Sequence, residues 1–248
     1  MIAVVTSAIV LHALNFSESS RILRLATREA GVQSVLARGA RASQKRFGSA
    51  VDLFAEGEVQ YVVRSGRDLH TLSRFDVQRS RIALGTSLPR FEGASALAEV
   101  MLRVGVEDDT PEHAFDALRS GLDAIATDAD ATVATVRAIW RLLGALGFTP
   151  ALDACVRCDA ELDATTDVAF SADAGGAVCA RCAAAAPSRN LPATARARIR
   201  AWLADAVSEP IAMDEPTTRA HRRLLRIFVH AHLTEGRPLR AFDAWATA

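Results

Sequence analysis

The sequence predicts an α+β protein in which a small β-barrel precedes a bundle of helices, and a cysteine-rich insertion interrupts the helices. Three observations carry this prediction. Short apolar runs fill the first 80 residues, apolar residues recur at helical spacing from about residue 90, and all four cysteines lie between residues 151 and 186. The predicted domains are residues 1–80 for the barrel, 81–150 and 187–248 for the helices, and 151–186 for the insertion.

The first domain contains five runs of apolar and β-branched residues, which favour strands. The runs are Ala3–Leu14, Arg21–Thr27, Val32–Arg38, Val51–Val63 and Leu69–Val77. Gly57 inside the fourth run predicts a β-bulge, and the residues from Arg64 to Arg67 predict a hairpin turn. Five short strands in about 80 residues suit a small closed barrel, of which the OB-fold is one type.

Helical spacing replaces the strand pattern after the barrel. Before the cysteines we expect a helix through Ala94 to Val104, a second from the N-cap pair Thr110-Pro111 to about Ala126, and a third over Thr132–Leu146. After the cysteines we expect amphipathic helices near Pro192–Val207 and Pro216–Thr234. We interpret their apolar stripes as the core of a helical bundle.

The cysteines form two CxxC pairs, Cys155 with Cys158 and Cys179 with Cys182, separated by twenty residues. Two such pairs supply four thiolates for one tetrahedral zinc ion. Gly175 and Gly176 permit a tight turn before the second pair. There are three alternatives. Two disulfides require an oxidising compartment, and a redox-active CxxC requires a thioredoxin-like context. A catalytic zinc ion requires an open coordination position. We therefore predict one structural zinc ion bound by all four cysteines.

Charge is unevenly distributed, although the formal net charge of the chain is zero. Residues 1–81 carry 12 Arg or Lys against 7 Asp or Glu, a net of +5, and residues 82–248 carry 17 against 22, a net of −5. A basic segment indicates a polyanionic partner; the alternative is a chance excess on a solvated surface. Because no convincing export signal or membrane-length apolar run occurs, we expect a cytoplasmic protein.

Motifs of the common enzyme classes are absent from the sequence. A P-loop needs a lysine after a glycine, but Lys45, the only lysine, follows Gln44. The HExxH, GxSxG and GxGxxG patterns do not occur either. We therefore predict no catalytic residues and no enzymatic activity. An enzyme with an unrecognised site is the alternative.

Three motifs, in this order, resemble the bacterial RecO family of recombination mediators. They are GARxSxxRFG at Gly39–Gly48, LGFxPxLDxCVxC at Leu146–Cys158 and FSxxxGGxxCxxC at Phe170–Cys182. The resemblance covers most of the chain and weakens after about residue 190. It implies an N-terminal OB-fold, a helical domain and a zinc-binding insertion. The main alternative is a zinc-ribbon protein of another class that binds RNA or regulates transcription.

The resemblance also implies a function in DNA repair and recombination, in association with the nucleoid. Members of the family bind single- and double-stranded DNA and anneal complementary strands without ATP. They cooperate with RecR, in a pathway that includes RecF, to help load RecA on DNA coated by the single-strand-binding protein SSB. The resemblance further implies that the C-terminal tail of SSB binds the helical domain.

Annealing is driven by base pairing, so the protein need only gather two polyanions and reduce their repulsion. The basic residues of the barrel are the candidates for this role: Arg21, Arg24, Arg38, Arg41, Lys45 and Arg46. Few aromatic residues accompany them, so we expect weak discrimination between single and double strands. Four arginines of the last predicted helix share one face by their spacing and form either a solvated surface or a second contact to DNA or the SSB tail: Arg219, Arg222, Arg223 and Arg226.

Overall fold

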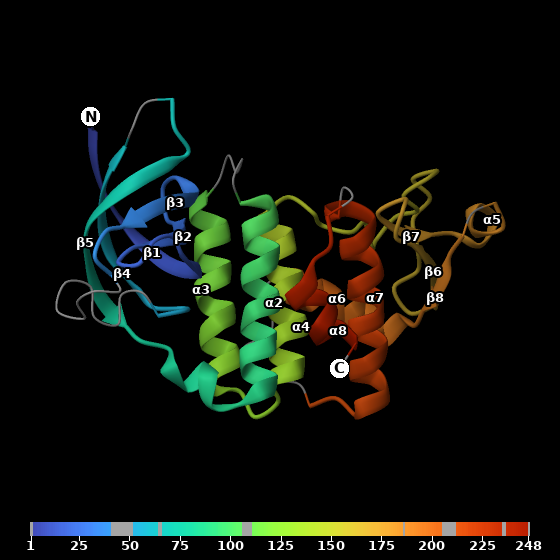
Figure 1. Cartoon of the computed structure of the whole chain (residues 1–248). Helices are drawn as coiled ribbons and strands as arrows, with labels where there is room; N and C mark the ends of the chain where they lie inside the picture. The colour runs from blue at the N-terminus through green and yellow to red at the C-terminus, as the bar shows by residue number, and fades with distance from the viewer. Residues whose placement is uncertain are drawn as a thin grey trace.

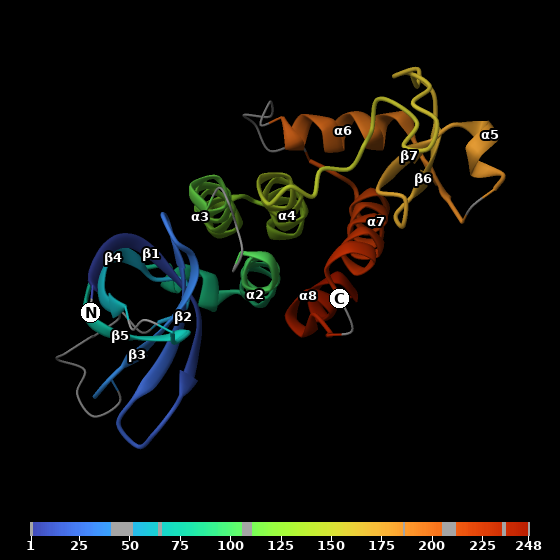
Figure 2. The same ribbon diagram turned by 90° about the horizontal axis from the view of Figure 1, so that it is seen from above.

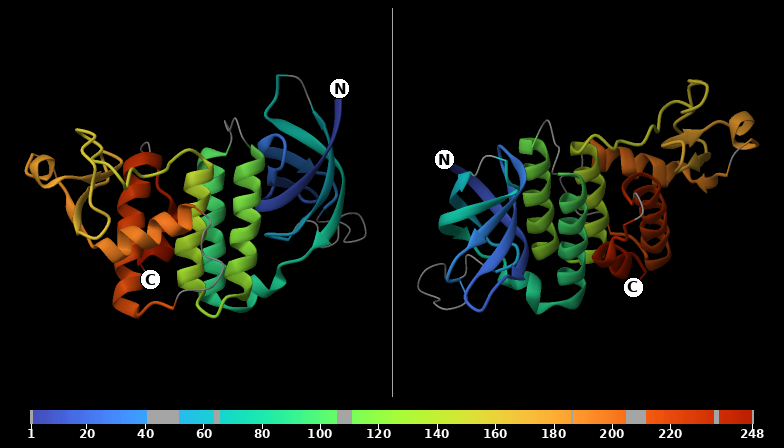
Figure 3. Two further views of the ribbon diagram at one scale, coloured as in Figure 1. Left: turned by 180° about the vertical axis from the view of Figure 1, so that it is seen from behind. Right: turned by 45° about the horizontal axis from the view of Figure 1, so that its top comes forward.

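The computed structural model describes residues 2–40, 52–63, 66–105, 111–185, 187–204, 212–234 and 237–247. A β-barrel lies at one end of the molecule, helices form the middle, and the cysteine-rich insertion lies at the other end (Figures 1 and 3). The predicted α+β class is confirmed. Within the described ranges, no helix combines the length and apolarity needed to cross a membrane.

The barrel consists of β1 (Ile2–Asn15), β2 (Arg21–Thr27), β3 (Gly31–Ala37), β4 (Glu56–Val63) and β5 (Leu69–Arg79). It closes in the order β1-β2-β3-β5-β4, with β3 and β5 parallel and the other neighbours antiparallel. The long β1 pairs with β4 through its first half and with β2 through its second half. This closure confirms the predicted OB-like barrel.

The fourth strand begins at Glu56, not at the predicted Val51, which lies outside the described residues. Phe54 adopts the left-handed conformation at φ 66° and donates its backbone N–H to the Val10 carbonyl at 2.8 Å. This turn takes Phe54 out of the ladder and into the core shared with the helices. The predicted bulge is confirmed, because the β4–β5 register shifts between Glu56 and Gly57.

The helical region contains a short 3-10 helix, η2 (Ile82–Thr86), followed by α2 (Leu88–Val104), α3 (Pro111–Thr127), α4 (Ala131–Ala145), α6 (Ala193–Leu203), α7 (Glu215–Leu233) and α8 (Arg240–Thr247). The five predicted helices are present, whereas α8 was not predicted. The expected N-cap residue Thr110 and the expected end at Val207 lie outside the described residues. The α4 cap is Asp130, whose carboxylate accepts the N–H groups of Thr132 and Val133 at 2.9 and 3.0 Å.

Apolar contacts and ion pairs join the barrel to α2 and α3, which stand beside it (Figure 2). The Arg28 guanidinium binds both carboxylate oxygens of Asp116 on α3, at 2.8 and 2.9 Å. Val32 donates its N–H to the Gly105 carbonyl at 2.8 Å, and a Cβ at Gly31 would lie 2.5 Å from that oxygen. Gly31 therefore permits the close approach of β3 to the end of α2.

The insertion contains β6 (Val168–Ser171), β7 (Gly176–Val178) and the one-turn helix α5 (Ala180–Ala183), and it is followed by β8 (Arg189–Leu191), which pairs with β6. The strands form a sheet in the order β7-β6-β8. The insertion packs on α7 through Phe170, whose ring centroid lies 6.1 Å from that of Phe228. Independent folding of the three parts at the predicted domain boundaries stays a prediction.

Candidate nucleic-acid interface and metal centre

The four cysteines form one cluster. The Sγ atoms of Cys155, Cys158, Cys179 and Cys182 all lie within 4.8 Å of one another. Tetrahedral zinc with zinc–sulfur bonds of roughly 2.3 Å requires sulfur–sulfur distances of about 3.8 Å. The Cys158 and Cys179 sulfurs are 3.8 Å apart. The donor set and its spacing therefore fit a metal ion coordinated by four thiolates.

Two different backbone turns present the two pairs. In the first, Asp159 adopts φ 56° and donates its N–H to the Cys155 carbonyl at 2.8 Å. In the second, Cys179 immediately precedes α5 and accepts the Ala183 N–H at 2.9 Å. Backbone hydrogen bonds, first from Cys179, lower the pKa of the Cys155 thiol to about 6. Hydrogen bonding with the Cys179 and Cys158 sulfurs raises the pKa of the Cys182 thiol to about 12.

The predicted glycine turn also has a geometric reason. Gly175 has φ +84°, and a Cβ at Gly176 would lie 2.3 Å from the Ala151 carbonyl oxygen. Ala151 pairs with Gly176 in a parallel bridge at the edge of the sheet. The turn therefore brings the β6–β7 hairpin against the strand segment that leads to Cys155.

The structure separates the predicted DNA-binding residues. Arg21 begins β2 and pairs with Ala37, the residue before Arg38, so both arginines lie at one end of the barrel. Arg24 lies farther along β2, opposite His12 of β1. Arg24 is half-buried, and this burial lowers the pKa of its guanidinium. Arg41, Lys45 and Arg46 lie outside the described residues.

Other barrel arginines are engaged in the fold. The Arg81 side chain is 3% exposed and contacts Glu56, Asp123 and the Phe54 carbonyl. Arg28 is held by Asp116, as described above, and Arg79 pairs with Asp123. These cations stabilise the junction with the helices and are poor candidates for binding phosphate. In the described part of the barrel, Arg21, Arg24 and Arg38 have no ion pair.

The four α7 arginines do not form one free surface. Arg222 donates to the Trp245 carbonyl and lies over the Trp245 ring, with 5.2 Å between its guanidinium carbon and the ring centroid. Arg226 pairs with Asp243 at 3.1 Å, and Arg219 pairs with Glu215 one turn earlier. Among the described residues, Arg223 has no ion pair and lines a groove of about 470 Å³ between α6 and α7. Packing by α8, which periodicity alone could not show, engages Arg222 and Arg226.

A barrel carrying unpaired arginines, joined by helices to a distant four-cysteine cluster, defines an α+β protein with a basic end and a cysteine-rich end that could hold a metal ion. Comparison with known sequences then specifies the family. Residues 1–81 match the family described as recombination protein O N terminal, and residues 86–241 match recombination protein O C terminal. The chain belongs to the RecO family.

Relatives named DNA repair protein RecO are similar over nearly the whole chain. The relative from Anaeromyxobacter sp. strain K is 39% identical over 242 residues, covering 95% of this chain and 92% of the relative. The relative from Anaeromyxobacter dehalogenans strain 2CP-C is 40% identical over 245 residues, with the same coverage. The relative from Rubrobacter xylanophilus is 29% identical and covers 90% of both chains. The resemblance found in the motifs is therefore confirmed.

Proposed function

We propose that this protein is a DNA repair and recombination mediator that binds single- and double-stranded DNA and anneals complementary strands without ATP. The observation that carries the proposal is the set of unpaired arginines on an OB-like barrel in a chain of the RecO family. Arginines that neutralise phosphates release counterions and reduce repulsion between two strands. The sequence has no P-loop, so the proposed annealing draws its energy from base pairing.

We propose zinc as the resident ion of the cysteine cluster. Four cysteine ligands are typical of structural zinc and leave no coordination position open for a substrate. When bound, the ion would cross-link the two CxxC turns and hold the insertion on α7. The ligands proposed are Cys155, Cys158, Cys179 and Cys182.

With RecR, and with RecF in the same pathway, the protein is proposed to help load RecA on SSB-coated DNA. The groove between α6 and α7 supports a place for the acidic SSB tail. Its lining combines the cations Arg189, Arg198 and Arg223 with apolar residues such as Leu191 and Leu224. Electrostatic attraction and apolar burial would then act together on a short acidic peptide.

An annealing assay tests the proposed function. Two complementary labelled strands, bare or coated with SSB, are mixed with the protein without nucleotide. We expect faster pairing in both cases, and deletion of the SSB tail should remove only the activity on coated strands. A strict requirement for ATP, or no acceleration of bare strands, would contradict the proposal.

A further inference from the structure

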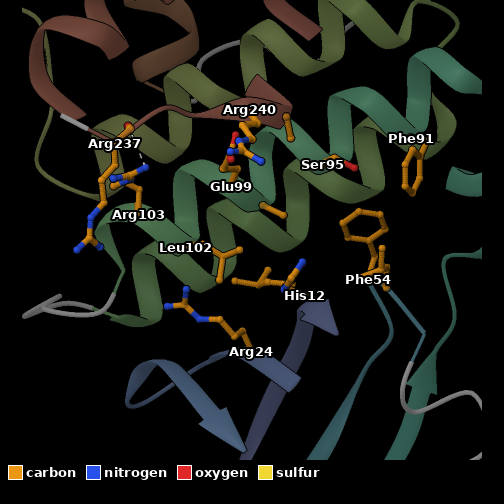
Figure 4. A pocket seen from close by; sticks show the side chains of 14 residues that line it. His12, Arg24, Phe54, Phe91, Ser95, Glu99, Leu102, Arg103, Arg237 and Arg240 are labelled. Atoms are coloured by element: carbon orange, nitrogen blue, oxygen red, sulfur yellow. Dashed lines mark hydrogen bonds between the residues drawn. The ribbon is translucent and has the colours of Figure 1, made fainter. Parts of the chain in front are cut away.

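A cleft of about 680 Å³ separates the barrel from the helices. Its walls come from β1 and β2, from the turn before β4, from α2 and from the segment at the start of α8. These parts lie far apart in the sequence, so no motif marks the cleft. Figure 4 shows Arg24, Arg103, Arg237 and Arg240 toward one end and the rings of Phe54 and Phe91 at the other.

The arginine end of the cleft has excess positive charge. Four arginines line it against one carboxylate, Glu99, a balance of 4 − 1 = +3. Glu99 is already engaged, because it accepts the backbone N–H of Phe242 in the first turn of α8 at 2.9 Å. Across the described ranges, none of the four arginines forms an ion pair. Their charges are therefore available to an anion.

Two of these arginines have positions that the fold determines. Arg103 donates to the carbonyls of Arg237 and Pro238 at 3.2 and 3.3 Å, which joins α2 to the C-terminal segment. Arg24 and Ala26 lie on the same face of β2, because side chains alternate along a strand. Ala26 packs in the core shared with the helices, so this face is directed toward the cleft. Arg237 and Arg240 are exposed and make no side-chain hydrogen bond in the described structure. The cleft thus combines two arginines that the fold positions with two exposed arginines at its rim.

The other end of the cleft offers an aromatic surface. The Phe54 and Phe91 ring centroids are 6.4 Å apart in an edge-to-face arrangement. Phe54 is buried, whereas Phe91 is 39% exposed and shares the lining with the partly exposed Leu53. A half-exposed ring at the end of a basic channel is the arrangement on which unpaired bases stack.

We propose that this cleft binds one single strand of DNA, with its phosphates on the arginines and a base on Phe91. This inference rests on the proposed DNA-binding function and specifies that this site binds single-stranded DNA. The cleft has the volume of a site for a ligand of one or two nucleotides, which is too small for a duplex. Bases in a duplex are also stacked on one another and cannot cover Phe91. The cleft therefore favours single strands, in contrast to the weak discrimination expected from the sequence.

Fluorescence anisotropy with a labelled oligothymidine strand and a labelled hairpin duplex tests this site. The cleft variants are the double substitution R237Q/R240Q and the single substitutions F91A and F91L. The control is R74Q/R119Q, which removes the same charge from arginines outside the cleft that are paired with Asp76 and Asp116. F91L retains most of the apolar volume, so its effect reports loss of the flat ring if F91A unfolds.

We expect R237Q/R240Q to weaken single-strand binding by about tenfold at low salt and to reduce the salt slope by about 1.4, since each phosphate contact contributes roughly 0.7. F91L should weaken it about fivefold through lost stacking while leaving duplex binding within about twofold. The control should bind as the wild type. Equal effects of F91L on both DNA forms would overturn the proposal.

The failures are distinguishable. If the wild-type protein binds no DNA, the proposed function itself is wrong. If R21Q/R38Q weakens binding and the cleft variants do not, the barrel end binds DNA and the cleft proposal alone is overturned. It is also overturned if the cleft variants retain single-strand binding but lose binding of a short aspartate-rich peptide, because the cleft is then a peptide site.

Discussion

The two ends of this molecule achieve a stable structure in different ways. The barrel encloses its own core, in which Val10, Leu23, Leu25 and Val35 are fully buried, and its strands close into a complete hydrogen-bonded ring. The strands at the insertion are only three or four residues long, and Cys155 of the first CxxC pair is fully buried. The barrel is stabilised by its own apolar core, whereas the insertion buries apolar side chains such as Phe170 against the helices and gathers four cysteines that could hold a metal ion.

This difference assigns the proposed DNA binding to the barrel and the proposed metal site to the insertion. The barrel core is apolar, and Arg21 and Arg38 form no ion pair in the described structure, so both are available to contact DNA. The insertion uses its distinctive residues to hold itself together, and it lies at the far end of the molecule from the barrel (Figure 1). Changes at one end should therefore leave the properties of the other end nearly unchanged.

The largest expected effect is loss of the proposed zinc ion. Cys155→Ser should unfold residues 151–185, since structural zinc sites contribute roughly 10–16 kcal/mol of apparent binding energy in small domains. Hydrogen exchange should then rise throughout the insertion, while β1 to β5 keep their protection. Cys182→His, which retains a zinc ligand, is the matched control and should preserve more protection. Increased exchange in the barrel of the serine variant would show that the ends are coupled.

A large effect is also expected at the junction between barrel and helices. Arg81→Met leaves Glu56 and Asp123 without their buried partner and should cost about 3–5 kcal/mol of unfolding free energy. The control is Arg74→Met, because the Arg74 side chain is 70% exposed and its solvent-screened pair with Asp76 should contribute little to stability. Urea unfolding followed by circular dichroism gives both values. Similar losses in the two variants would mean that the buried cluster does not fix the barrel.

Acid should lower the stability of the helical region around His221 of α7. Burial lowers the pKa of His221 to about 4, and repulsion by Arg198 acts in the same direction. Because the unfolded histidine titrates near about 6.5, the folded state binds fewer protons, so stability falls as the pH drops from about 6.5 to about 4. The loss should be roughly 3 kcal/mol, discounted for incomplete burial. His221→Leu should remove this part of the pH dependence in urea titrations, and an unchanged profile would contradict the assignment.

The smallest effect on stability, but a clear effect on DNA binding, is expected at the end of the barrel that carries Arg21 and Arg38. Neutralising Arg21 and Arg38 together should weaken binding to all sequences alike and reduce the single-strand salt slope by about 1.4. Unfolding free energy should change by less than about 0.5 kcal/mol per site. Anisotropy at several salt concentrations measures the slope. A sequence-dependent loss would indicate base contacts in place of phosphate contacts.

Much of this architecture could be predicted from local patterns. Strand alternation and turn residues gave five strands, and helix caps with apolar spacing gave five helices, because these signals depend on near neighbours. The CxxC spacing predicted the cysteine cluster for the same reason. The start of β4 differs from the predicted one because Phe54 packs against helices that are distant in sequence.

The sites that depend on tertiary packing could not be predicted. The cleft combines Arg24, Arg103 and Arg240 from three separate elements, and none of them belongs to a motif. The α7 arginines had the right helical spacing for a shared face, but Trp245 and Asp243 of α8 bind two of them. Only the fold shows which cations are already paired and which remain available.

Annealing of bare complementary strands tests the central claim most directly. The rates for wild type, Cys155→Ser and R21Q/R38Q are compared without nucleotide, after hydrogen exchange has shown that each barrel is folded. We expect the serine variant to anneal at nearly the wild-type rate and the arginine variant to be markedly slower. Loss of annealing in the serine variant with an intact barrel, or full activity of the arginine variant, would contradict the separation of the two ends.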